Sequence, residues 1–156
     1  MVQKTLQDVC TAMLPVDERL TVKRCRYAPQ TVEPETGLNR TGRKVPRLCI
    51  VTGIHGDELE GQYVCYELSR YLSQENTELD GIIDIYPALN PLGIDTITRG
   101  IPSFDLDMNR IFPGNLDGSM PETLAQNIMK SLKGADMVAV QQVYIVSRVV
   151  AVLREM

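Results

Sequence analysis

The sequence predicts an α/β fold, and three stretches of the 156-residue chain carry that prediction. Residues 47–54 (RLCIVTGI) and 82–89 (IIDIYPAL) are short apolar runs, which are typical of strands buried on both faces of a sheet. Between them, residues 57–74 change to a helical spacing of apolar side chains. A strand, a helix and a strand in this order form a βαβ unit, whose crossover we expect to be right-handed.

The segment before this unit has two predicted elements and a loop. Residues 3–14 predict an amphipathic helix ending before Pro15, because five apolar side chains follow the spacing i, i+3, i+4, i+7 and i+8: Leu6, Val9, Cys10, Met13 and Leu14. Residues 20–27 (LTVKRCRY) predict a strand at a sheet edge, since its three basic side chains resist burial. Residues 28–46 hold three prolines and two glycines, and we interpret them as a loop.

The helix over residues 57–74 has an irregular apolar stripe formed by Leu59, Val64, Leu68, Tyr71 and Leu72. Acidic residues crowd its first turn, where the helix dipole favours negative charge.

The segment after the βαβ unit begins with residues 90–120, which show no clear periodicity. A loop of this length inside a compact domain is usually functional. Ser119 and Glu122 then form the pattern of a capping box, so a helix is expected from there to about Lys133, with Gly134 as its stop. Residues 135–140 (ADMVAV) predict a third buried strand, and a β-prone tail covers residues 143–153.

Composition restricts the class of protein. Apolar residues make up 44% of the chain and charged residues 23%, as in ordinary globular domains, and the formal net charge of −4 argues against binding to nucleic acid or to anionic membranes. The four cysteines form no CxxC pair, which suits reduced thiols in the cytoplasm. The sequence has neither a signal-peptide pattern nor an apolar run long enough for a membrane span.

His55 is the only histidine in the chain, and Glu58 follows it by three residues at the junction of a strand and a helix. Side chains with this spacing point to the same side of a helix start, and both are good zinc ligands. The junction also lies beyond the carboxyl end of a strand, where ligands bind in open α/β sheets. The alternative is a surface histidine beside a glutamate that the helix dipole stabilises.

Three side chains in the long loop suit an anionic substrate: Arg99, Asn109 and Arg110. Guanidinium groups bind carboxylates through two hydrogen bonds, and an asparagine amide adds a donor and an acceptor. The alternative is a solvated loop whose arginines pair with nearby aspartates. Asp105 and Asp107 fit a turn, and we assign them no catalytic role.

Four motifs follow one another along the chain: GIHGDELEG at residues 53–61, ALNPLG at residues 88–93, Arg99, and DLDMNRIFPG at residues 105–114. In this order they resemble the succinylglutamate desuccinylase/aspartoacylase family, a branch of the zinc carboxypeptidase-like fold. The resemblance covers residues 45–138. It implies a three-layer α/β/α domain with a mixed, mostly parallel sheet.

The resemblance also implies an activity and roles for individual residues. The activity would be hydrolysis of the amide or acyl bond of an N-acyl amino acid, or of a related small carboxylate-bearing substrate, by water that Zn²⁺ activates. His55 and Glu58 would be the first two zinc ligands. Arg99 would act in catalysis by polarising the scissile carbonyl or holding the substrate, and Asn109 and Arg110 would bind the substrate carboxylate.

The chain departs from the family pattern at its end. The histidine that the family uses as third zinc ligand falls at Gln142, and no segment matches the one that carries the general base. We therefore expect one incomplete catalytic domain over residues 1–156, truncated at its C-terminus, with a divergent tail at residues 139–156. A frameshift after Val138 is one hypothesis for this tail.

Two other functions stay open at this stage. One is a catalytically inactive remnant that acts at most as a binding or interaction domain, because two protein ligands hold zinc weakly. The other is a metal-free α/β domain that binds a small carboxylate through Arg99 and Arg110. The sequence predicts no oligomeric state.

Overall fold

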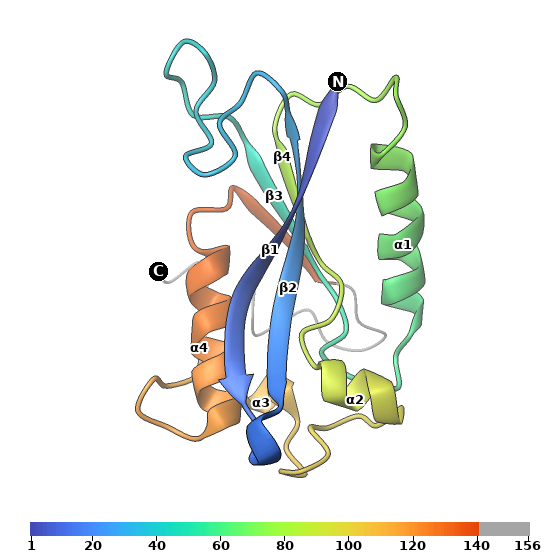
Figure 1. The fold of residues 1–156 in the computed structure, drawn as a ribbon, viewed down its shortest axis with the longest axis vertical. Helices are drawn as coiled ribbons and strands as arrows, with labels where there is room; N and C mark the ends of the chain where they lie inside the picture. The colour runs from blue at the N-terminus through green and yellow to red at the C-terminus, as the bar shows by residue number, and fades with distance from the viewer. Residues whose placement is uncertain (141–156) are drawn as a thin grey trace.

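The computed structural model describes residues 1–140, which form a five-stranded mixed sheet with helices on both faces (Figure 1). The elements in chain order are β1 (Val2–Met13), the 3₁₀ turn η1 (Pro15–Asp17), β2 (Arg19–Pro29), β3 (Arg47–Val51), α1 (Glu60–Leu72), β4 (Ile82–Tyr86), α2 (Pro91–Thr96), α3 (Met108–Ile111), α4 (Met120–Leu132) and β5 (Met137–Val140).

The sheet has the order β1-β2-β4-β3-β5. Strands β4, β3 and β5 pair in parallel, whereas β2 is antiparallel to both of its neighbours, β1 and β4. Four of the five strands therefore run in one direction, and only β2 runs against them. The predicted βαβ unit is confirmed as β3-α1-β4.

The two long helices lie on opposite faces of the sheet, with α4 on one side and α1 on the other (Figure 1). The larger core lies under α4, where Leu124, Ile128 and Leu132 pack with the buried Val22 and Val51 from the sheet. The smaller core lies under α1, where Cys65 and Leu72 pack on Tyr27 and Ile85. This arrangement confirms the predicted α/β class and its three layers.

The helix predicted for residues 3–14 is wrong, because these residues form the long strand β1 at an edge of the sheet. The expected apolar face is divided: Leu6 and Met13 are 59% and 58% exposed, whereas Val9, Cys10 and Leu14 are half-buried and pack against the larger core. A register shift between Asp8 and Cys10 in the pairing with β2 disturbs the alternation of this strand.

The edge position predicted for residues 20–27 is also wrong, because β2 lies between β1 and β4. Its basic side chains are tolerated inside the sheet since the neighbouring strand β4 supplies Asp84, a fully buried carboxylate. Asp84 receives two hydrogen bonds of 2.7 Å from Arg26 and lies 3.6 Å from Arg24.

Helix α1 is confirmed, but the face that it buries differs from the predicted stripe. Gly61, Cys65 and Leu72 are buried, whereas Val64 and Tyr71 are exposed.

The C-terminal part of the described chain follows the predictions closely. Ser119 and Glu122 form the predicted capping box of α4, and Gly134 follows that helix with φ +78°. The strand expected over residues 135–140 is present as β5, but it is not buried, since Met137 is 65% exposed. The predictions for Gln142 and for residues 143–153 lie outside the described residues. Within residues 1–140, no helix is long and apolar enough to cross a membrane.

Candidate metal and substrate site

The candidate site forms where the chain leaves β3 and turns towards α1. Two backbone hydrogen bonds join this turn to the segment after the adjacent strand β4: Leu89 N–H donates to Thr52 O at 3.2 Å and Asn90 N–H donates to Gly53 O at 2.8 Å. Parallel strands end at the same edge of a sheet, so these two segments meet there, and His55 lies two residues after Gly53 in the first of them.

Glycine is required in this turn because backbone approaches backbone. A Cβ atom on Gly56 would lie 1.9 Å from the carbonyl carbon of Gly93 and 2.4 Å from the nitrogen of Ile94. Gly53 has φ +67°, a conformation that other residues rarely adopt. The close contact packs the His55 turn directly against the first turn of α2.

Asn90 fixes the other wall of the site. Its side-chain oxygen accepts a hydrogen bond from Gly93 N–H at 3.0 Å and so caps α2, and its Nδ2 donates to Gly100 O at 3.0 Å. This buried side chain therefore ties the end of β4 to the segment that carries Arg99.

Both ring nitrogens of His55 face carboxylates, and its side chain is fully buried. Nδ1 lies 3.0 Å from Glu58 Oε1, and Nε2 lies 2.9 Å from Asp107 Oδ1. A carboxylate oxygen can only accept, so a protonated Nε2 donates to Asp107 and a protonated Nδ1 donates to Glu58. With the proton on Nε2, Asp107 holds the ring and Nδ1 is directed at Glu58, where a metal ion can bind between the two atoms.

The donor set at Nδ1 therefore fits part of a zinc site. An imidazole nitrogen and a carboxylate oxygen converge on one position, and a carboxylate behind the imidazole is the usual support of a zinc-ligating histidine. Within residues 1–140, no group of three histidine, cysteine or acidic side chains is arranged to hold a metal ion, so the described part of the chain offers two ligands.

Asp107 is the side chain that the sequence analysis missed. It caps the short helix α3 by accepting a hydrogen bond from Asn109 N–H at 3.0 Å. Burial alone would raise the pKa of Asp107, but hydrogen bonds from His55 and Asn109 and the charges of His55 and Arg99 hold it below its usual range. The carboxylate therefore stays ionised and keeps His55 oriented.

The three residues predicted to suit an anionic substrate, Arg99, Asn109 and Arg110, lie around His55, Glu58 and Asp107. Arg99 Nη1 donates to Glu58 Oε1 at 3.0 Å, so one carboxylate oxygen faces both Arg99 and His55. Asn109 Nδ2 lies 3.2 Å from His55 Nε2. The Arg110 side chain is 84% exposed and lies 3.7 Å from Asp107. The fold thus brings together all five site residues that the sequence singled out.

Comparison with known proteins identifies the family to which this chain is similar. A family model described as the succinylglutamate desuccinylase/aspartoacylase catalytic domain matches residues 44–139. A curated relative, the N-alpha-acetyl-L-2,4-diaminobutyric acid deacetylase of Halomonas elongata, is 33% identical over 87 residues, which cover 56% of this chain and 25% of the relative.

Solved structures show the same fold. An aspartoacylase family protein from Mesorhizobium loti superposes with a TM-score of 0.68 and 28% identity, over 90% of this chain and 40% of that one. A metallo-carboxypeptidase from Burkholderia cenocepacia gives a TM-score of 0.65 at 15% identity, over 88% and 36% of the two chains, which is a likeness of fold alone. The chain spans about a quarter of the length of the curated relative and about two fifths of the length of these structures.

Proposed function

This chain belongs to the succinylglutamate desuccinylase/aspartoacylase family, and on that premise we propose that it serves zinc-dependent hydrolysis of the acyl–nitrogen bond of N-acyl amino acids or related small carboxylates. The observation that carries the proposal is the convergence of His55 Nδ1, Glu58 Oε1 and Arg99 Nη1, with separations of 3.0 Å on either side of the glutamate oxygen. This arrangement combines two zinc-ligand chemistries with a cation that can stabilise a developing oxyanion.

His55 and Glu58 are the proposed zinc ligands of this chain. Zinc, when bound, supplies Lewis acidity that makes water a usable nucleophile at neutral pH. Asp107 is proposed to act through His55, by holding the proton on Nε2 so that Nδ1 presents its lone pair to the metal.

The arginines and Asn109 are the proposed substrate contacts. Arg99 has a half-exposed side chain anchored on Glu58, which suits a guanidinium that reaches a scissile carbonyl beside the metal. Arg110 keeps its guanidinium in solvent, where it can bind a substrate carboxylate through two hydrogen bonds. The Asn109 amide is proposed to add a donor or an acceptor to that carboxylate.

Zinc analysis of the purified chain tests the metal half of the proposal. We expect zinc that co-purifies with the chain to be lost in Glu58→Gln and in His55→Ala. Glu60→Gln is the matched control, because Glu60 is an exposed glutamate two residues further along the same segment. Wild-type chain that binds no zinc at all would exclude the site.

Hydrolysis assays test the reaction separately. The substrates are N-acetyl and N-succinyl amino acids, each assayed with and without a chelator. Chelator-sensitive turnover that Arg99→Ala abolishes would support the enzyme and contradict the alternative of a catalytically inactive remnant. Zinc binding without turnover would favour the alternative, a binding domain that keeps the metal ligands.

A further inference from the structure

A second polar cluster lies within the sheet, centred on the buried carboxylate of Asp84, the middle residue of β4, and it reaches the amino end of the parallel strands at Arg47. Arg26 from β2 donates to both of its oxygens at 2.7 Å, and Arg47 from the start of β3 donates to Oδ2 at 2.8 Å. Arg24 lies 3.6 Å away. Three guanidinium groups therefore surround one carboxylate.

The charges of this cluster do not balance. Asp84 neutralises one of the three arginines, and the exposed fractions of the Arg24, Arg26 and Arg47 side chains are only 19%, 5% and 12%. Carbonyl oxygens take part of the excess: Arg26 donates to Pro34 O, and Arg47 donates to Ser131 O at 2.7 Å and to Lys133 O at 3.2 Å. These acceptors are neutral, so a positive field remains in a region of low dielectric.

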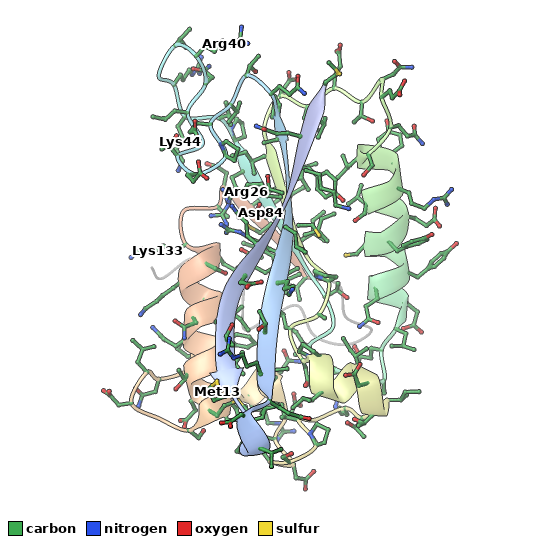
Figure 2. All side chains as sticks on the ribbon, in the orientation of Figure 1. Met13, Arg26, Arg40, Lys44, Asp84 and Lys133 are labelled. Atoms are coloured by element: carbon green, nitrogen blue, oxygen red, sulfur yellow. The ribbon has the colours of Figure 1, made fainter. Side chains whose placement is uncertain are left out.

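A cavity of about 180 Å³ opens over this cluster, between the loop before β3 and the C-terminal end of α4. We call it the amino-end pocket. Its charged lining consists of Arg26, Glu35, Lys44, Arg47 and Lys133. Four cations thus face one carboxylate in the wall, and Asp84 lies behind the arginines. Figure 2 shows Arg26 beside Asp84, with Lys44 on the loop and Lys133 at the end of the helix.

The pocket still has donors to offer. Arg26 uses three of its five N–H groups in hydrogen bonds, on Asp84 and Pro34 O. Lys44 Nζ makes one long hydrogen bond of 3.4 Å, to Gly134 O. Asp84 explains why the three arginines are buried here. It does not explain why two lysines, Lys44 and Lys133, also line the pocket.

We propose that the amino-end pocket binds a small oxyanion, a phosphate or a short carboxylate, through Lys44 and Lys133 and the excess charge of Arg26 and Arg47. The volume limits the ligand, since pockets for drug-sized molecules span about 300–1,000 Å³. The site is separate from the proposed zinc site: Arg47 begins β3 and Val51 ends it, on the order of 13 Å away at about 3.3 Å per residue, and His55 lies in the turn beyond Val51.

Titration calorimetry of the purified 156-residue chain tests the proposal, with inorganic phosphate and succinate added in separate experiments at constant ionic strength. We expect saturable binding of at least one anion. The anion that binds with the higher affinity shows whether the pocket prefers a phosphate or a carboxylate.

Two double variants locate the binding. Lys44→Ala with Lys133→Ala is expected to weaken it about tenfold, because it removes two of the four cations that line the pocket. Lys23→Ala with Lys130→Ala is the matched control, which removes the same charge from exposed positions outside the pocket and is expected to leave the affinity unchanged. All four lysines are exposed, and thermal unfolding verifies that both proteins are folded.

Three results would overturn the proposal. One is a folded wild-type chain that binds neither anion. Another is an equal loss in both double variants, which would reflect net charge alone. The third is binding that survives the loss of Lys44 and Lys133 but disappears in Arg110→Ala, which would assign the anion to the other end of the sheet.

Discussion

Beyond the carboxyl end of the parallel strands one histidine stands between two carboxylates, and within the strands one carboxylate stands among three arginines. Both clusters use charged hydrogen bonds of 2.7–3.0 Å between neighbouring segments. They differ in solvent exposure. Asp84 is fully buried and Arg26 is 5% exposed, whereas the Arg99 and Arg110 side chains are 49% and 84% exposed.

The difference separates what each cluster does. A buried ion pair has lost its water, so removing one partner leaves charges that nothing else can solvate. The arginines around His55 keep their water and can exchange it for a ligand. The Asp84 cluster therefore holds strands β2, β3 and β4 together, while the His55 cluster is preorganised at its centre and open at its rim.

The largest effect should follow Asp84→Ala, which leaves three guanidinium groups without their carboxylate. We expect a loss of about 3–5 kcal/mol in the free energy of unfolding, measured by urea denaturation. Asp8→Ala is the control, because Asp8 forms only an exposed pair with Lys23 at 3.8 Å and should cost less than about 1 kcal/mol. Similar losses in the two variants would remove the contrast between buried and exposed charge.

The stability that Asp84 contributes should depend on pH. Burial raises the pKa of Asp84, but hydrogen bonds from Arg26 and the charges of Arg26, Arg47 and Arg24 outweigh it and hold the pKa below the ordinary value of 3.8. Because the pKa of Asp84 is lower in the folded chain than in the unfolded chain, its contribution to stability is complete above the unfolded-state pKa. The contribution is lost as the pH falls through the folded-state pKa.

The measurement compares wild type with Asp84→Asn in urea at a series of pH values. The difference in unfolding free energy should stay constant above about pH 5 and shrink below about pH 4, where the unfolded chain takes up the proton. A difference that already declines between neutral pH and about pH 5 would contradict a depressed pKa.

The next largest loss in the free energy of unfolding should follow Gly56→Ala, in the turn beyond the carboxyl end of β3. Its Cβ would meet the backbone of Gly93 and Ile94, so the His55 turn and α2 must separate at a cost of about 2–3 kcal/mol. In Gly42→Ala nothing lies within 4 Å of the new Cβ, and only the φ of +76° should cost about 1 kcal/mol. Equal stability of the two variants would show that the contact with α2 is not rigid.

The smallest effect is expected from Asp107→Asn, measured as zinc affinity by competition with a chromophoric chelator. An amide oxygen can still accept from His55 Nε2 but brings no charge, so we expect affinity to fall about tenfold. Asp105→Asn is the control in the same loop, since Asp105 is exposed. Unchanged affinity in Asp107→Asn would mean that the carboxylate does not position His55.

The interior of the fold was predictable from sequence, whereas its N-terminal edge was not. Strands β3 and β4 are short apolar runs, and tertiary packing confirms them. In β1 the register shift between Asp8 and Cys10 inserts a residue and changes which face the following side chains occupy. The apolar residues then fall at helical spacing although the backbone is extended, so the pattern of a single strand misleads without its partner.

The predicted edge position of β2 was wrong for a different reason. Basic residues in a strand indicate an edge only when no buried carboxylate pairs with them. Asp84 lies 58 positions after Arg26 in the sequence, and only the antiparallel pairing of β2 with β4 brings Arg26 opposite Asp84. A sequence pattern within one strand contains no sign of that partner.

At the candidate site, the sequence singled out the five polar side chains that lie together around His55 and Glu58, but it gave no role to Asp107. The signal was present in DLDMNR, where an aspartate two residues before an asparagine can cap a helix and accept a backbone hydrogen bond. The distance of 52 residues between Asp107 and His55 hid its second role, which only the folded loop shows.

The segment between Arg99 and Asp107 closes on itself, and this has a consequence for how such proteins can diversify. Ile101 N–H donates to Leu106 O at 3.0 Å, and Asn90 anchors the preceding Gly100, while the four residues between Ile101 and Leu106 are exposed. When both ends of a loop are held in place, lengthening the loop costs little additional free energy. Residues 102–105 therefore form a module that evolution or a designer can lengthen or exchange, changing the surface beside the site while Arg99 and Asp107 keep their positions.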